Sequence, residues 1–358
     1  MLPSGWRALT PLVALALVSA RSETPRLLTP AHSYREPPAY TVVDLGTLSG
    51  TLPGESSRAY GINSAGQVVG ASTTSHNEVH AFLWEHGVMR DLGTLGGTMS
   101  IARGINDRGQ VVGESTTASG IWRAFLWQDG GMVDLGTLGG PYSLAHSVNE
   151  AGHVVGQAMT TPIGDTNAFL WQDGVMQSLG TLGPVGTYSI AYSVNALDQV
   201  VGVGSTGYSQ QHAFLWEDGT LTDLGTLPGG SYSIARGISP SGEIIGDSYR
   251  SDNLDPHAIR WVNGKLEELG DLGGGYSSAK AINAYGQIVG VSSRTTDAND
   301  YDAFVWQNGV MTALGRLGGS NSQAFAINAA GQIAGEAATT NGRQHAALWT
   351  VLPRQGAP

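Results

Sequence analysis

A glycine-rich run with an acidic residue at its head, Asp91–Ser100 (DLGTLGGTMS), has the composition of a loop that holds a phosphate group. Such a loop needs a strand before it and a helix after it, so that the N–H groups of the first helical turn point at the phosphate. Here the following residues predict a strand, and the Lys-Ser/Thr pair of an ATP-binding loop is missing. The literal GxGxxG at Gly202–Gly207 also leads into a predicted strand. Neither run indicates nucleotide binding, and the sequence predicts no cofactor.

Histidines and carboxylates recur at fixed places. The histidines that stand before an Ala-Phe pair or a variant of it are His80, His212, His257 and His345. The residues that replace them elsewhere are Arg123, Asn167 and Asp302. Equivalent positions of neighbouring repeats lie too far apart to share a zinc ion, whose bonds are only about 2 Å long. The copies of Asp91 include Ser178, Glu268 and Ala313. We therefore expect these side chains to make structural hydrogen bonds, Asp91 to the backbone N–H groups of its own turn.

Other catalytic patterns are missing from the chain. It has no HExxH, no EF-hand spacing and no G-x-S-x-G between a strand and a helix. With no cysteine, it has neither thiolate metal ligands nor a cysteine nucleophile. Paired carboxylates for glycoside hydrolysis depend on their separation in space, and nothing in the sequence selects such a pair.

Three sequence markers each occur seven times, about every 45 residues. The first is DLG, beginning at Asp44 and Asp91; the second is GIN, ending at Asn63 and Asn106; the third is AFLW, ending at Trp84 and Trp127. In the second unit, Ser100–Asn106, Gln110–Ser115, Arg123–Gln128 and Gly131–Gly136 predict four strands. An NDRG turn and an Asp-Gly hairpin separate them. Units of 40–45 residues with four strands and no room for a helix are typical of propeller blades.

The combined motifs HAFLW (His80–Trp84 and His212–Trp216), DLGTLGG and GINxxGQVVG resemble those of the HAF-repeat family of bacterial extracellular proteins. The resemblance covers Thr41 to about Val351. It implies secretion and repetition, but the family is known mainly as a sequence class. It therefore supplies no defined activity and no catalytic residues.

The ends of the repeat predict how the propeller closes. The chain begins with a copy of the fourth strand, Tyr40–Gly46, and ends with a copy of the third, Ala346–Trp349. The missing strand at one end is the surplus strand at the other. We predict an all-β fold, a seven-bladed β-propeller of four-stranded blades in which the N-terminal strand closes the last blade. The AFLW tryptophans should lie in the core between blades.

Function should lie where the units differ. The glycine turns after the first and third strands belong to one face, and the variable connections belong to the other, which we call the variable face. Two of these connections, Ser248–His257 and Ser292–Asp302, are acidic. Their aspartates are Asp252, Asp255, Asp297, Asp300 and Asp302. They predict either a solvated acidic rim or a calcium site, since hard cations bind clustered oxygens.

Tyrosines precede the first strand in four consecutive units, at Tyr142, Tyr188, Tyr232 and Tyr276. Four residues after each tyrosine come His146, Tyr192, Arg236 and Lys280, and Arg103 has the same place in the preceding unit. Aromatic rings with donors between them could stack on a sugar or a peptide at the central mouth. The alternative is that these residues only pack at the blade entrance.

The N-terminus predicts export. Arg7 and the short apolar stretch Ala8–Ala20 are typical of a signal peptide cleaved near Ala20. Residues 21–39 then form a linker, 40–351 the propeller and 352–358 a tail. The mature chain is expected to have no transmembrane segment. Its net charge of −11 leaves no basic patch and argues against nucleic-acid binding.

These observations predict a secreted, monomeric, non-catalytic propeller that binds a glycan or protein through its variable face. One alternative is a hydrolase or lyase that acts on polysaccharide or peptide in the central funnel. It requires close carboxylates, or a histidine with a carboxylate, at the mouth. Another is a purely structural envelope or extracellular protein, because a propeller fold does not fix a function.

Overall fold

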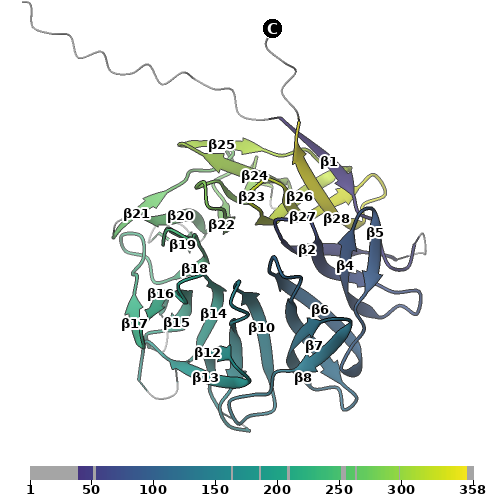
Figure 1. The fold of residues 1–358 in the computed structure, drawn as a ribbon. Coiled ribbons are helices and arrows are strands. Elements are labelled where there is room, and N and C mark those ends of the chain that lie inside the picture. Colours follow the sequence, from purple (N-terminus) through teal and green to yellow (C-terminus); the bar gives the residue numbers. More distant parts are fainter. Residues whose placement is uncertain are drawn as a thin grey trace, which may run out of the picture. The chain divides into compact units, whose positions relative to one another are not determined.

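The computed structural model describes residues 39–50, 54–162, 164–184, 187–207, 210–250, 255–262, 264–297 and 299–352. The regular structure of these residues consists of strands and no helix, which confirms the all-β prediction (Figure 1). Among them there is accordingly no helix of the length and apolar character that crossing a membrane requires. The predicted signal peptide and linker lie outside the described residues.

The strands come in groups of four. The N-terminal strand β1 (Tyr40–Asp44) belongs with the last group. The first three groups are β2 (Ser57–Ile62), β3 (Val68–Thr73), β4 (Val79–Glu85) and β5 (Val88–Asp91); β6 (Gly96–Ile105), β7 (Val111–Thr117), β8 (Trp122–Gln128) and β9 (Gly131–Asp134); β10 (Ser143–Val148), β11 (Val154–Met159), β12 (Thr166–Gln172) and β13 (Val175–Gly180). The others are β14 (Ser189–Val194), β15 (Val200–Ser205), β16 (Gln211–Glu217) and β17 (Thr220–Asp223); β18 (Ser233–Ile238), β19 (Ile244–Ser248), β20 (His257–Val262) and β21 (Lys265–Glu268); β22 (Ser277–Ile282), β23 (Ile288–Ser293), β24 (Tyr301–Gln307) and β25 (Val310–Ala313); β26 (Gly318–Ile327), β27 (Ile333–Thr339) and β28 (Gln344–Val351).

Each group is an antiparallel meander. Five groups form separate four-stranded sheets, and the groups β2–β5 and β6–β9 are joined into an eight-stranded sheet by one parallel pair, Val79 with Met99. The N-terminal strand β1 pairs with β28 and supplies the fourth strand of the sheet β1-β28-β27-β26, as the ends of the repeat predicted. Figure 1 shows this pair, with purple β1 beside yellow β28.

Neighbouring groups share hydrophobic cores. One core joins Val68 and Phe82 of the first full group to Ala334, Ala346 and Leu348 of the last group. The tryptophans of the AFLW marker contribute as predicted: Trp127, Trp261, Trp306 and Trp349 are buried, and the others pack at core edges. The first strands contact one another in sequence, β2 with β6, β6 with β10 and so on to β26, and β26 contacts β2.

A belt of asparagine side chains also links the groups. We call Asn63, Asn106, Asn149, Asn195, Asn283 and Asn328, which end the first strands, the asparagine belt. Each donates its Nδ2–H to the backbone carbonyl at the same position of the next unit, as Asn106 does to Asn149 over 2.9 Å. Asn328 donates to Asn63 over 2.9 Å and so links the last unit to the first. Only the fifth unit, with Ser239, has no asparagine to donate; its hydroxyl instead lies 2.9 Å from that of Ser241.

Glycines occur where the backbone requires them. The turn glycines, such as Gly109, have positive φ, and Asp198 replaces one of them with φ 60°. The glycine-rich run Asp91–Ser100 contains the last residue of β5 and the first residues of β6. A Cβ on Gly97 would lie 2.2 Å from the Thr116 Oγ1 and 2.6 Å from the Thr117 carbonyl oxygen. This glycine therefore permits close backbone approach, and no helix follows it.

Candidate functional site

A β-bulge interrupts every first strand. The pairing of each first strand with its second strand shifts by one residue at the same place. The residues left in these shifts, which we call the bulge residues, are Tyr60, Arg103, His146, Tyr192, Arg236, Lys280 and Phe325. A bulge re-aims a side chain without adding a ladder bond. The bulge residues include the five residues that the sequence analysis placed four positions after the tyrosines or their equivalent, which are Arg103, His146, Tyr192, Arg236 and Lys280.

All seven first strands line a common cavity of about 180 Å³, which we call the central cavity. Six of the bulge residues lie in its wall; for β26 the wall is formed by Ala326. The bulge residues also contact one another. The Arg103 guanidinium lies 4.7 Å from the centre of the Tyr60 ring, and the His146 and Tyr192 rings are 5.3 Å apart. Tyr60 and Phe325 are likewise 5.3 Å apart, so the contact series spans the last and first units.

Three buried carboxylates support the cations near this cavity. Glu114, Asp247 and Glu336 each follow the glycine of a second strand and are almost fully buried. Arg103 Nη2 lies 2.6 Å from Glu114 Oε1, and Arg236 Nε lies 2.6 Å from Asp247 Oδ2. Sequence reasoning missed these acids, and it also missed Tyr60 and Phe325. The signal was a single acidic residue in an otherwise apolar strand, as in VVGES, IIGDS and IAGEA.

Burial perturbs the ionisable groups at the cavity. It lowers the pKa of His146 to about 3, with a further lowering by Arg103, so this imidazole is neutral at physiological pH. Burial also lowers the pKa of Lys280 to about 8, an effect that Asp247 opposes and Arg236 reinforces. Burial raises the pKa of Glu114, although the adjacent Arg103 favours its charged form.

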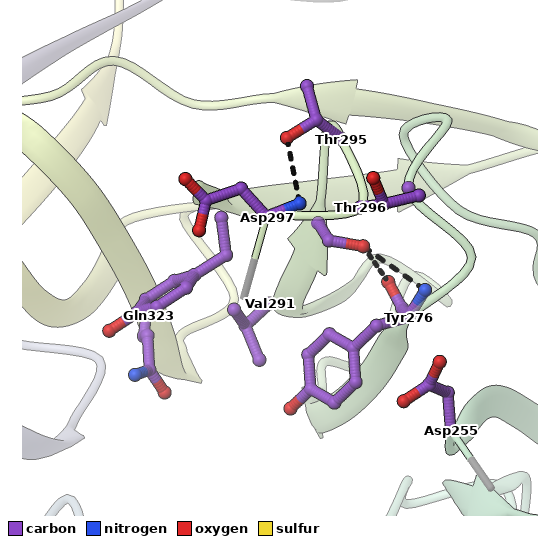
Figure 2. A pocket seen from close by; sticks show the side chains of 10 residues that line it. Asp255, Tyr276, Val291, Thr295, Thr296, Asp297 and Gln323 are labelled. Carbon is purple, nitrogen blue, oxygen red and sulfur yellow. Dashed lines mark hydrogen bonds between the residues drawn. The ribbon is translucent and has the colours of Figure 1, made fainter. Parts of the chain in front are cut away.

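A second cavity, of about 310 Å³, lies among the loops before β20, before β22 and between β23 and β24. We call it the loop pocket; its lining includes Asp255, Tyr276, Val291, Asp297, Tyr301 and Gln323. Figure 2 shows the Tyr276 ring between the carboxylates of Asp255 and Asp297, which lie at opposite sides of the view. Tyr276 lies directly before β22 and precedes Lys280 of that strand by four residues. The two cavities thus lie on opposite sides of the bulge residues, and only the loop pocket is formed by variable connections.

The four predicted tyrosines occupy equivalent positions. The backbone carbonyls of Tyr142, Tyr188, Tyr232 and Tyr276 each accept a hydrogen bond from the second strand or its end, over 2.9 to 3.0 Å. Only Tyr276 lines the loop pocket, whereas Tyr232 packs edge-on against Tyr249 with their centres 4.9 Å apart. Burial raises the pKa of both Tyr232 and Tyr276 to about 12, so both stay protonated hydroxyl groups.

The acidic loops do not bring their carboxylates together around a cation position. Buried Asp302 pairs with Arg316 and, over 3.1 Å, with Arg294; Asp300 lies 2.8 Å from Arg316. Asp252 lies outside the described residues. Within the described ranges, no group of three or more His, Asp or Glu side chains has an arrangement that could hold a metal ion. In place of a calcium ion, Arg294 and Arg316 provide the positive charge beside Asp300 and Asp302.

The histidines before the Ala-Phe pairs have the structural role that the sequence predicted. His80 Nδ1 lies 2.8 Å from Asp91 Oδ2, and the pairs His212–Asp223 and His345–Asp44 repeat this geometry. Asp91 Oδ1 also accepts the Gly93 backbone N–H over 2.8 Å. None of these pairs lies in the wall of either cavity.

Comparison with known proteins identifies the fold. No family model matches the chain, and neither does any curated protein. Among solved structures, it is similar to the β-propeller domain of the Trilobed protease from Pyrococcus furiosus, with a TM-score of 0.57 and 10% identity over 84% of this chain and 99% of that domain. That domain is described as having an open velcro topology, whereas here β1 pairs with β28.

Two peptidase structures show the same likeness. A prolyl endopeptidase matches with a TM-score of 0.54 and 10% identity, over 89% of this chain and 48% of the endopeptidase. The acylaminoacyl peptidase from Pyrococcus horikoshii matches with a TM-score of 0.52 and 11% identity, over 81% of this chain and 51% of the peptidase. At these identities the likeness shows the fold alone. The chain has a β-propeller fold built of four-stranded antiparallel sheets.

Proposed function

We propose that this chain is a secreted, seven-bladed, closed β-propeller that binds a glycan without catalysing a reaction. The sevenfold repeat supports the number of blades, and three sets of contacts between the last and first units support closure. These are the β1–β28 pairing, the Asn328–Asn63 hydrogen bond and the bond from the Ala346 backbone N–H to Ser57 Oγ at 2.8 Å. The sequence motifs support a relation to HAF-repeat proteins, and the signal-like N-terminus supports export.

The loop pocket carries the binding proposal. Its volume of about 310 Å³ lies at the small end of the range for small-molecule sites. A protein partner, by contrast, usually needs a broad surface of about 800 Å² on each side. The pocket combines two tyrosine rings with a glutamine amide, threonine hydroxyls and carboxylates. Aromatic faces can stack on a sugar ring while the polar groups accept or donate hydrogen bonds to its hydroxyls. One or two sugar units of a glycan fit this chemistry.

A glycan array tests the proposal. We expect the wild-type chain to be retained, Tyr276→Ala to lose retention, and Tyr276→Phe to keep most of it because the ring remains. Tyr285, in the same unit but 71% exposed on a turn and outside both cavities, provides the matched control. Tyr285→Ala should bind like the wild type. Equal losses in the two alanine variants, or no retention of the wild-type chain, would contradict the assignment.

A polysaccharide hydrolase is the second candidate, because the loop pocket contains two carboxylates, Asp255 and Asp297. Glycoside hydrolysis uses two carboxylates that flank the scissile bond. Incubation with oligosaccharides that the array identifies distinguishes the two functions. The appearance of new reducing ends that Asp297→Asn abolishes would establish hydrolysis and refute the non-catalytic proposal. Unchanged oligosaccharides support binding alone.

A further inference from the structure

The central cavity has an unusual charge for this chain. The protein carries a net charge of −11 and only two lysines, Lys265 and Lys280. Yet the described residues that line the cavity include three cations, Arg103, Arg236 and Lys280, and no carboxylate. Tyr60 and Tyr192 add hydroxyl groups to the wall. A wall with these donors and no acidic side chain has the composition of an anion site.

Comparison between units shows that Lys280 differs from the two arginines. Arg103 and Arg236 each pair with an acid on the second strand of their own unit, Glu114 and Asp247. In the unit of Lys280 the same second-strand position is Val291. The Lys280 ammonium makes no hydrogen bond or ion pair with another described residue. Its unit therefore supplies a cation with no acid of its own at the second-strand position.

The nearby carboxylate of Asp247 is already engaged. Its Oδ2 accepts from Arg236 Nε over 2.6 Å, and its Oδ1 accepts the backbone N–H of Ala279 over 3.1 Å. The terminal nitrogens of Arg236, in contrast, have no acceptor among the described residues. Donors on Arg236 and Lys280 are thus available to a molecule in the cavity.

The geometry points to a binding site for a small carboxylate in the central cavity, with Lys280 and Arg236 as its ligands. Glu114 and Asp247 neutralise the two arginines, so the wall keeps a net charge of about +1, which matches a monoanionic carboxylate better than a phosphate dianion. His146 is neutral and adds no charge. The cavity of about 180 Å³ is also much larger than one water needs, roughly 10–15 Å³.

This site goes beyond the proposed glycan function, because it lies on the other side of the bulge residues from the loop pocket. Titration calorimetry of the full chain with sodium acetate, sodium D-glucuronate and inorganic phosphate, at constant ionic strength, tests it. We expect saturable binding of a carboxylate, with phosphate weaker. Lys280→Met should weaken carboxylate binding about tenfold or more, since a hydrogen bond to a charged group is lost. Lys265→Met, on an exposed strand start, should change it less than twofold.

A second measurement uses the wild-type chain and so does not depend on how a variant folds. Acetylation of the two lysines is followed by mass spectrometry with and without the carboxylate. The carboxylate should slow acetylation of Lys280 and leave that of Lys265 unchanged. Absence of saturable carboxylate binding at millimolar concentration would overturn the proposal. Equal effects at the two lysines in either experiment would overturn it as well. Loss of glycan retention alone would refute only the loop-pocket function.

Discussion

The gap in the asparagine belt predicts a stabilising substitution. Where the preceding unit has a belt asparagine, the backbone carbonyl of the next belt residue accepts two hydrogen bonds. Asn106 O, for example, accepts Gly109 N–H over 3.0 Å and Asn63 Nδ2–H over 3.1 Å. Among the described residues, Asn283 O accepts only Gly286 N–H, over 3.1 Å, because Ser239 is too short to reach it. Ser239→Asn should supply the missing donor.

The expected gain follows from the bonds exchanged. The Ser239 hydroxyl already accepts the Glu243 backbone N–H over 3.0 Å, a role that the asparagine Oδ1 fills in other units. The substitution loses the 2.9 Å bond between the Ser239 and Ser241 hydroxyls, which in other units is replaced by a bond from the backbone N–H two residues on to the asparagine Oδ1. The net change is one added bond to a backbone carbonyl, worth about 1 kcal/mol. A domain of about 310 residues unfolds with an entropy near 0.65 kcal/mol/K, so Tm should rise by about 1.5 °C.

Differential scanning calorimetry measures this shift, and the chain offers a reciprocal control. Asn195→Ser removes the equivalent bond, from Asn195 Nδ2 to the Ser239 carbonyl at 3.3 Å, together with the bond to Gln199 Oε1 at 2.6 Å. It should lower Tm by a similar or somewhat larger amount. The double variant should lie near the wild type. Ser239 is only 1% exposed, so a larger side chain must fit a closed site. A fall in Tm for Ser239→Asn, or no change while Asn195→Ser is destabilised, would refute the reasoning.

Three further outcomes are expected. Deleting Thr41–Gly46 removes β1 from β28, and calorimetry should then show a broad, less cooperative transition; a single sharp transition would contradict the proposed closure. Lys280→Met should be more stable than the wild type at pH 7 in buffer without carboxylates, because the wild type buries a charged ammonium. Burial lowers the pKa of Lys280 from the ordinary value of 10.5 to about 8 in the folded chain. The free energy of unfolding of the wild type should therefore rise between about pH 8 and pH 10.5 and approach that of the variant. Urea unfolding at several pH values tests this. Asp91→Asn breaks a half-exposed pair with His80 and should lower stability by less than about 1 kcal/mol, measured by the same unfolding.

Local sequence signals predicted most of the framework. The Asn-x-x-Gly turns and the Asp-Gly hairpins are encoded by residues with positive φ, as Asp129 and Gly130 confirm with 52° and 84°. The pairing of β1 with β28 followed from the order of the repeat markers. The turns depend on residues close together in the chain, and the pairing of β1 depends on strict repetition. Both kinds of pattern are visible in the sequence alone.

The candidate sites were only partly predictable because they depend on contacts between units. Counting from the tyrosines identified His146, Tyr192, Arg236 and Lys280, and the same place in the preceding unit gave Arg103. The prediction was not extended to the first and last units, so Tyr60 and Phe325 were missed. The partners of Asp300 and Asp302 include Arg316, which lies beyond the following strand pair. The loop pocket assembles Asp255, Tyr276 and Gln323 from three different units. A single sequence contains no direct sign of such convergence.

The bulge position shows why a repetitive framework can still carry a specific site. Bonds between units use positions that are nearly identical in every unit, such as the asparagine belt and the serine three residues before each bulge residue. The bulge residue makes no ladder bond to the second strand, so its identity is not constrained by pairing. It differs accordingly: two tyrosines, two arginines, a histidine, a lysine and a phenylalanine point from equivalent backbone positions. Lys280 makes no hydrogen bond or ion pair with a described residue, and burial opposes its charge, which Asp247 only partly offsets. Packing alone does not explain a lysine at this position, and the proposed carboxylate site would.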